Sequence, residues 1–204
     1  IGYLIMLNRI ALLLVILFFA GASIGNTDIR PTEKHIKATN IITGVIQRYH
    51  YKKVALDNNL SAQIWERYLD SFDPNHNIFL QSDINHFARY KYKIDDTLLQ
   101  SNLDPAYEIF LVFIKRLENR VKYAIALLDK KYDFTIKELY EFDRHDKPWP
   151  IDVSESDTLW DKRVKNDLLS LRITGKSSEE IKTTLVKRYE RLIRNMEQWK
   201  NEDI

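Results

Sequence analysis

The 204-residue sequence contains no cysteine. This absence excludes disulfide bonds, thiol redox motifs and zinc sites built on thiolates. It leaves the cellular compartment open, because a domain of this size folds without disulfide staples. Glycine and proline are also scarce, at five residues each. Their scarcity argues against a turn-rich β-sandwich and favours long helices.

Charge of one sign is nowhere concentrated. The chain carries 31 lysines and arginines against 29 aspartates and glutamates, which are interspersed along its length and leave a net charge of +2. A nucleic-acid-binding protein normally has a clustered basic stripe, so no nucleic-acid partner is expected. Hydrophobic residues make up 45% of the chain, which is enough for a buried core.

One long hydrophobic run lies near the N-terminus. Residues 10–22 carry no charge, follow an arginine, and end at Ala20 and Ala22, which stand at A-x-A spacing. This pattern predicts an export signal peptide over residues 1–25, cleaved near these alanines, and a mature domain over residues 26–204. A retained anchor in the inner membrane is the alternative, although the run is shorter than the ~20 residues that cross a bilayer as a helix.

Helical periodicity appears in every long segment beyond the signal, and it predicts an all-α domain of about six helices. Capping residues mark the predicted starts, and Pro74 and Gly175 mark two of the predicted ends. The predicted spans are Thr32 to about His50, Asp57 to Pro74, Ser82 through Leu98, Asp104 to about Lys131, Ser154 or Asp157 to Gly175, and Ser177 to at least Asn201.

Apolar residues at helical spacing define the expected core. The fourth predicted helix has the widest apolar stripe and is the expected spine of the domain. In the first helix the residues expected to face inward are Ile36, Ile41, Ile42, Val45, Ile46 and Tyr49. Trp65, Tyr68, Phe72 and Phe79 gather around Pro74. They form either core or a peptide-binding surface, and their helical spacing favours core.

Residues 132–153 interrupt the helical pattern. They place Trp149 between Pro148 and Pro150 and crowd charges beside them. We expect a long connection here, with a short extended or helical piece over residues 136–142. Trp149 either pins the connection to the helices or presents a contact to a partner.

One group of residues has the composition of a metal site. Asp73, His76, Asp83 and His86 lie close together in the sequence, and two imidazoles with two carboxylates could hold a metal ion. The HxxxH and HExxH spacings are absent, and capping explains each residue more simply. Asp73 suits the turn before Pro74, and Asp83 suits the first turn of a helix. We therefore predict no metal and no cofactor.

Catalytic motifs are missing from the sequence. It contains no G-x-S-x-G elbow and no phosphate loop, and Gly175-Lys176-Ser177 is a helix end followed by a capping box. Asp95 and Asp96 are expected on a solvated helix surface. A Ser–His–Asp triad is recognised by geometry in space, so sequence alone leaves that option open. No catalytic residue is predicted.

Three separated segments occur in an order that resembles a known family. HYKKVALDNNLSAQIWERYLDSFDPNHNIFLQSDINHF is followed by FDRHDKPWP, and then by LWDKRVKNDLLSLRITGKSSEEI leading into KRYERLIRN. With the export signal before them, these segments resemble the N-terminal helical domain of the tail-specific proteases, which are periplasmic carboxy-terminal processing serine peptidases. The resemblance covers nearly the whole mature chain.

The resemblance implies a non-catalytic scaffold. In this family the helical domain precedes a PDZ domain, which engages the C-terminus of a protein substrate, and a protease core in which a lysine activates a serine nucleophile. The chain would be a fragment that ends before both domains and is not an enzyme by itself. It would enclose the catalytic core and dock an adaptor lipoprotein in the periplasm. The alternative is a stand-alone periplasmic helical binding module with no protease attached.

Overall fold

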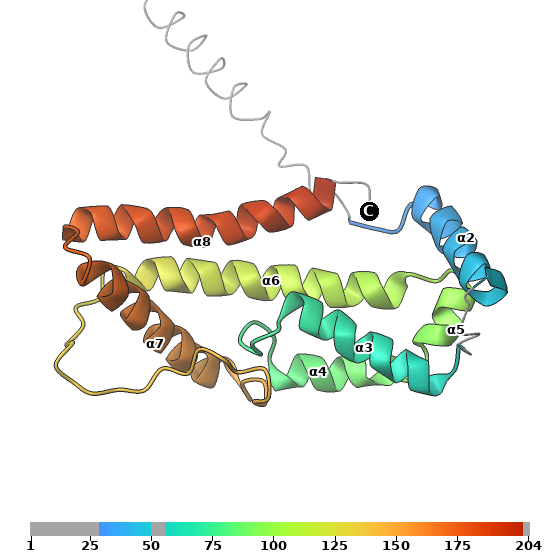
Figure 1. The fold of residues 1–204 in the computed structure, drawn as a ribbon, viewed down its shortest axis with the longest axis horizontal. Helices are drawn as coiled ribbons and strands as arrows, with labels where there is room; N and C mark the ends of the chain where they lie inside the picture. Colours follow the sequence, from blue (N-terminus) through green and yellow to red (C-terminus); the bar gives the residue numbers. More distant parts are fainter. Residues whose placement is uncertain (1–28, 50–55, 202–204) are drawn as a thin grey trace, which may run out of the picture.

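The computed structural model describes residues 29–49 and 56–201. Within these ranges the chain forms seven α-helices, one short 3₁₀ turn and no strand, which confirms the all-α fold (Figure 1). The elements are α2 (Glu33–Tyr49), α3 (Asn58–Phe72), α4 (Gln81–Phe87), η1 (Ala88–Tyr90), α5 (Ile94–Leu99), α6 (Asp104–Leu127), α7 (Val153–Arg172) and α8 (Ser178–Asn201).

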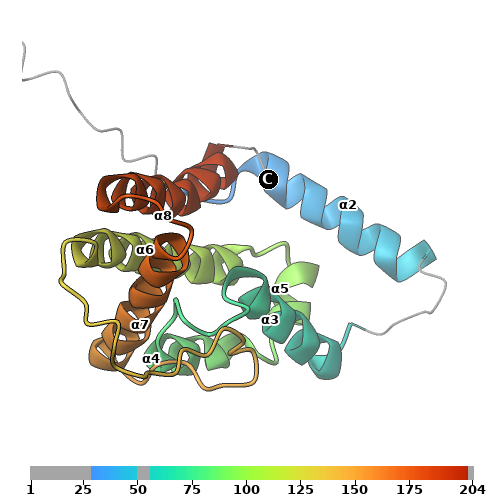
Figure 2. The ribbon, with the colours of Figure 1, turned by 60° about the vertical axis from the view of Figure 1, so that its left-hand side comes forward.

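Helix α6 is the spine of the domain, as its apolar stripe predicts. It contacts both α7 and α8, and the two views show α6 and α8 running side by side while α7 crosses at one end (Figures 1 and 2). The largest fully buried apolar side chains come from these helices and from α3, α4 and the turn between them: Trp160, Tyr189, Phe79, Phe87, Leu69, Ile109, Leu185, Met196, Val121 and Val164. Burial of this apolar surface is the main stabilising contribution to the fold.

The aromatic group around Pro74 belongs to this core. Trp65 and Phe79 are buried, while Tyr68 and Phe72 are partly buried and pack against the same cluster. The indole N–H of Trp65 donates to the carbonyl of Phe87 at 3.2 Å. The core interpretation of these four aromatic residues is therefore confirmed.

The single helix predicted from Ser82 through Leu98 is wrong, because the segment is divided into α4, η1 and α5. Ser61 on α3 explains the break. Its buried hydroxyl donates to the carbonyl of Lys91 at 3.0 Å and accepts the N–H of Ile94 at 2.7 Å. These are the backbone groups that an interrupted helix leaves without partners, so a residue from another helix stabilises the interruption.

Several helix ends differ from the prediction by a few residues. Helix α4 begins at Gln81, before the expected cap Ser82, because the Asp83 carboxylate accepts the N–H of Leu80 at 2.9 Å. Helix α7 likewise begins before Ser154, since the Asp152 side chain accepts the N–H of Glu155. Capping by a side chain fixes the start of a helix more narrowly than periodicity does.

One predicted end of α6 is wrong, whereas the glycine and the capping box predicted before α8 are present. Helix α6 ends at Leu127, before the predicted Lys131. Gly175 has a φ of +78°, the left-handed conformation predicted for it. The predicted capping box is confirmed, since Ser177 and Glu180 exchange hydrogen bonds, with Ser177 Oγ 2.7 Å from Glu180 Oε2.

The inward face predicted for α2 is wrong. Ile41, Ile42 and Val45 are more than half or about half exposed, at 67%, 58% and 50%. Ile36 and Ile46 are also exposed. Helix α2 packs mainly against the short helix α5, and no other described element covers its apolar stripe. Periodicity thus located the stripe correctly but assigned it the wrong environment.

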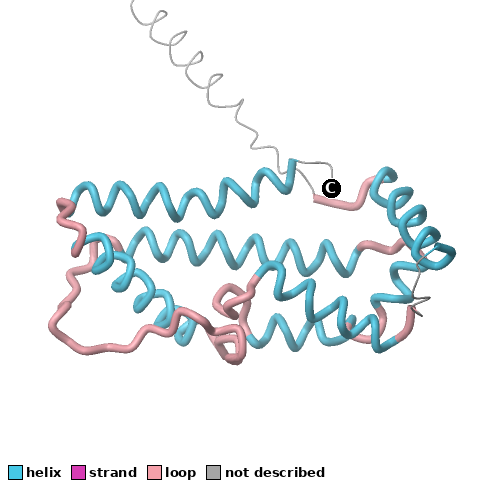
Figure 3. Tube along the Cα trace, in the orientation of Figure 1, coloured by secondary structure: helices cyan, strands magenta, loops and turns pink. Residues whose placement is uncertain are grey.

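Residues 128–152 form the long connection between α6 and α7, as predicted (Figure 3). Neither a helix nor a strand forms over residues 136–142, so the helical alternative predicted there is wrong. No helix among the described residues is both long enough and apolar enough to cross a membrane. The predicted signal segment, with Ala20 and Ala22, lies outside the described residues.

Candidate functional site

Asp73 organises the turn between α3 and α4. Its buried carboxylate accepts the backbone N–H groups of Asn77, Ile78 and Phe79 at 2.8, 2.9 and 3.0 Å. It also accepts the indole N–H of Trp149 at 3.1 Å. Burial raises the pKa of Asp73 above its usual range, and the four hydrogen bonds to its charged form oppose that rise. The prediction that Asp73 is a turn residue is confirmed.

His76 and Trp149 join this turn to the long connection. The two rings stack with centroids 3.7 Å apart, and His76 has a left-handed backbone with a φ of 47°. His76 Nδ1 lies 2.5 Å from the carbonyl oxygen of Lys147, and the N–H of Gln81 donates to the carbonyl of Pro150 at 2.8 Å. We call residues 73–81 with 144–150 the turn–connection junction. Trp149 therefore pins the connection to the helices.

Helix α7 is attached to the same turn. The indole N–H of Trp160, which is fully buried, donates to the carbonyl of Asn77 at 2.8 Å. Arg120 on α6 binds Asp157 on α7 at 2.5 Å and donates to Ser156 at 3.2 Å. The Trp160 contact joins α7 to the turn, and the Arg120 contacts join the first turns of α7 to α6.

The four candidate metal ligands do not come together as one site. Asp83 makes a bidentate ion pair with Arg116 on α6, both contacts being 2.8 Å. His86 lies 2.6 Å from the carboxylate of Glu108. These contacts occupy Asp83 and His86 on the α6 side, whereas Asp73 and His76 belong to the turn–connection junction.

Glu108 is the centre of a polar cluster that ties η1 to α6. It accepts hydrogen bonds from Tyr90 and Arg89, the latter at 2.6 Å, in addition to its contact with His86. Partial burial opposes ionisation of Glu108, but these hydrogen bonds and the Arg89 charge outweigh it and lower the pKa of Glu108 below 4.5. These contacts give Glu108 a structural role, because its charge is paired with Arg89 and its oxygens accept hydrogen bonds from neighbouring side chains.

The two neighbouring aspartates of α5 differ in environment. Asp96 is exposed, as expected, but Asp95 is buried with 5% of its surface accessible. The expectation of a solvated Asp95 is wrong, because α5 is held between α2 and α3 and one of its faces is covered.

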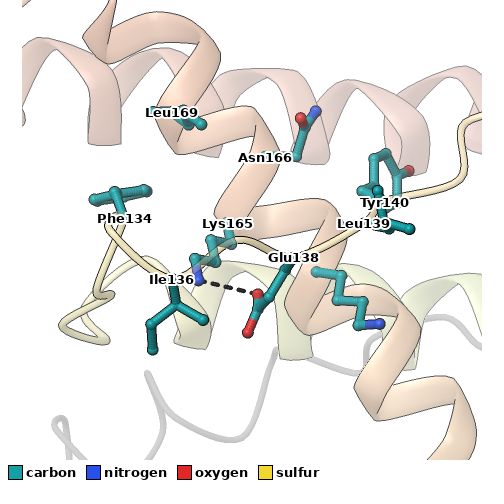
Figure 4. Close-up of a pocket in the computed structure, with 9 residues that line it drawn as sticks. Phe134, Ile136, Glu138, Leu139, Tyr140, Lys165, Asn166 and Leu169 are labelled. Carbon is teal, nitrogen blue, oxygen red and sulfur yellow. Dashed lines mark hydrogen bonds and ion pairs between the residues drawn. The ribbon is translucent and has the colours of Figure 1, made fainter.

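A groove lies between the long connection and α7. Figure 4 shows Phe134, Ile136 and Glu138 on the connection opposite Lys165 and Leu169 on the helix. Lys165 Nζ binds Glu138 Oε2 at 2.9 Å across the groove. We call this hollow the connection groove; its lining is Phe134, Ile136, Glu138, Leu139, Tyr140, Lys162, Lys165, Asn166 and Leu169.

The connection groove is open and partly apolar. Its volume is about 80 Å³, and it continues into a second open hollow of about 480 Å³ beside Leu159 and Arg144. Leu139 at its rim is 91% exposed and Phe142 next to it is 70% exposed. An open hollow with exposed apolar side chains suits a protein segment better than an enclosed small molecule.

The sequence of this domain matches one known class of domain. The profile described as "Tail specific protease N-terminal domain" matches residues 42–204. The chain therefore belongs to the family of tail-specific protease N-terminal domains.

The chain is also similar in sequence to a curated protein of this family. The chain is 40% identical over 174 residues to the tail-specific protease of Haemophilus influenzae (strain ATCC 51907 / DSM 11121 / KW20 / Rd). The matched region covers 85% of this chain and 25% of that protein. The chain thus spans about a quarter of the length of this relative.

Sequence reasoning missed two features of the site. The connection groove has no periodic signal, because its lining combines an irregular segment with one helix face. Asp70 and His145 were not grouped with His76, although the structure brings the three together. The motif residues Asp73, His76 and Trp149 were a detectable signal for a junction, but their mutual contacts depend on the tertiary fold.

Proposed function

We propose that the chain is a non-catalytic scaffold and docking domain of a periplasmic tail-specific serine endopeptidase, which degrades or processes proteins from their C-termini. Membership of the family supports the link to proteolysis. In this proposal a PDZ domain and a Ser/Lys protease core belong to the same protein, and an adaptor lipoprotein docks on the helical domain. The signal pattern of residues 1–25, with Ala20 and Ala22, supports export.

The observation that carries the docking role is the exposed apolar surface of the connection at and beside the connection groove. Leu139 and Phe142 lie three residues apart on the connection and are 91% and 70% exposed. Their segment has no regular structure of its own, yet the turn–connection junction holds its C-terminal end. A fixed loop that presents apolar side chains is a common form of protein-binding surface.

The proposal is tested with the whole protease that contains this chain, expressed with its own signal. Leu139→Asp and Phe142→Asp should each weaken binding of the adaptor lipoprotein by about tenfold or more, because a carboxylate replaces apolar contact area. Hydrolysis of a short unstructured peptide should be unchanged. The control is Ile173→Asp, which alters an equally exposed residue, 79% accessible, at the far end of α7.

Two results would contradict this proposal. If Leu139→Asp and Phe142→Asp both bind the adaptor with wild-type affinity, the connection is not the docking surface. If Ile173→Asp loses as much affinity as they do, the loss is a general effect of added charge. Cell fractionation in the same experiment addresses location. Recovery of processed protein from the periplasm supports export, whereas unprocessed protein in the membrane fraction supports the retained anchor.

A further inference from the structure

Three side chains that suit a metal ion converge beside the turn–connection junction. Asp70 lies on the last turn of α3, His76 in the following turn, and His145 in the connection. One ligand atom from each residue lies within 4.8 Å of the other two. Among the described residues this is the one such group of three.

His76 presents a nitrogen lone pair to this group. Its Nδ1 lies 2.5 Å from the carbonyl oxygen of Lys147, and a carbonyl oxygen only accepts, so the proton of the ring must be on Nδ1. The other nitrogen, Nε2, is buried and has no hydrogen-bond partner. It lies 3.6 Å from Asp70 Oδ1. In the neutral tautomer, Nε2 and Asp70 Oδ1 are therefore two acceptors that face each other, and His76 is only 8% exposed. A cation between the two atoms would stabilise this arrangement.

A histidine ligand usually donates its second ring N–H to a carbonyl or carboxylate, which fixes the orientation of the ring. His76 has this arrangement already, and its stacking on Trp149 fixes the ring plane. His145 Nδ1 lies 3.3 Å from the carbonyl oxygen of Pro74. When Nδ1 donates to that carbonyl, Nε2 of His145 also carries a lone pair.

We propose that Asp70, His76 and His145 bind a divalent transition-metal ion, with zinc the ion best suited to two imidazoles and one carboxylate. Zinc binds such ligands at about 2.0–2.2 Å, so two ligand atoms in a tetrahedral site lie about 3.4 Å apart. The three ligand atoms lie within 4.8 Å of one another, so the widest separation must shorten by up to about 1.4 Å. His76 is fixed, but Asp70 is partly exposed and His145 is exposed, so these two can move. Water completes the coordination from the solvent side.

The surrounding charges are compatible with a bound cation. Lys147 pairs with Glu141 at 3.0 Å, and Arg144 lies 4.0 Å from the same carboxylate. The ion would link the end of α3 directly to the connection and thereby restrain the segment that carries Leu139 and Phe142. The metal site stands on its own geometry and does not depend on adaptor docking.

Calorimetric titration of zinc chloride into the full chain, purified without a polyhistidine tag and stripped with a chelator, tests the proposal. One equivalent should bind saturably, and cobalt in its place should give the visible absorption of a four-coordinate site. Asp70→Asn and His145→Ala should each weaken zinc binding by about tenfold or more. At free zinc one hundred times the dissociation constant, the unfolding equilibrium constant should fall by about 100-fold.

His86→Ala is the matched control. His86 and Glu108 form a histidine–carboxylate pair with 2.6 Å between them, but no third ligand joins them among the residues that the structure describes. This variant should bind zinc like the wild type. Absence of one-to-one binding would overturn the proposal and leave His76 and Asp70 as an ion pair only. Unchanged affinity in both Asp70→Asn and His145→Ala would overturn it as well, as would a comparable loss in His86→Ala.

Discussion

Asp73 and Glu108 show how two carboxylates of one small domain acquire opposite properties. Asp73 is almost fully buried, and the desolvation of its charge raises its pKa despite four hydrogen bonds. Glu108 is only partly buried, so hydrogen bonds and the Arg89 charge prevail and lower its pKa. The balance between burial and hydrogen bonding decides the direction in each case. Neither residue needs a catalytic role to explain its environment.

Glu108 should contribute to the acid sensitivity of the fold. Because its pKa is lower in the folded protein than in the unfolded chain, the unfolded state binds the proton more readily as the pH falls. The stabilising contribution is therefore present above the ordinary value of 4.5 and is lost as the pH falls through the folded pKa. We predict that Glu108→Gln lowers the free energy of unfolding at neutral pH and that this difference shrinks as the pH falls below 4.5.

Urea unfolding at a series of pH values measures this effect. Glu190→Gln is the control, because Glu190 makes one exposed pair with Arg194 on the same helix. Its unfolding free energy should follow the wild-type pH dependence. A Glu108→Gln deficit that stays constant down to pH 3 would show that the charge of Glu108 has no part in the stabilisation.

A side chain from another helix stabilises the interruption between η1 and α5. Ser61 on α3 satisfies one carbonyl and one N–H across this break. Removing its hydroxyl leaves both backbone groups without that partner in a partly buried position. We predict that Ser61→Ala lowers the free energy of unfolding by about 2 kcal/mol, and that hydrogen exchange at the Ile94 amide becomes faster.

Ser71→Ala is the matched control for this prediction. Ser71 lies on the same helix but is exposed, and its hydroxyl bonds only to the carbonyl of Tyr68 within that helix. Its substitution should change stability by no more than about 0.5 kcal/mol. Equal effects of the two substitutions would mean that Ser61 does not hold the break.

Sequence reasoning was reliable for the existence of helices and weaker for their interruptions. The stripe from Phe110 to Ala124 repeats at helical spacing over many turns, so α6 could be predicted with its core face. The division into α4, η1 and α5 could not, because Ser61 acts from 30 residues away in sequence. Helix α2 shows a further limit, since periodicity finds an apolar face but does not say what covers it.

The candidate site was predictable only in part, for a similar reason. Asp73 could be assigned to the turn because an aspartate before proline caps the local backbone. His76 and Trp149 stack only after the connection returns to the turn, a contact between residues more than 70 positions apart in the sequence. The groove and the group of Asp70, His76 and His145 also require that return. Long-range contacts of irregular segments leave no periodic trace.

At the scale of the whole molecule, the chain is built to hold one irregular segment in a defined place. Helices α6, α7 and α8 pack against one another, and the turn–connection junction fastens the end of the connection to α7. Helix α2 and the connection both expose apolar side chains, which is typical of a domain that contacts other parts of an assembly. In the proposed function, this domain binds and supports, and bond cleavage belongs to the rest of the protease.

The most direct measurement is treatment of the purified 204-residue chain with a serine-directed phosphonate probe, alongside an assay with unstructured peptides that end in apolar residues. Because this domain is proposed to support cleavage without performing it, the account predicts no covalent adduct in intact-mass spectra and no peptide turnover. Stoichiometric labelling of a serine in the native chain, lost on unfolding and accompanied by peptide hydrolysis, would contradict it.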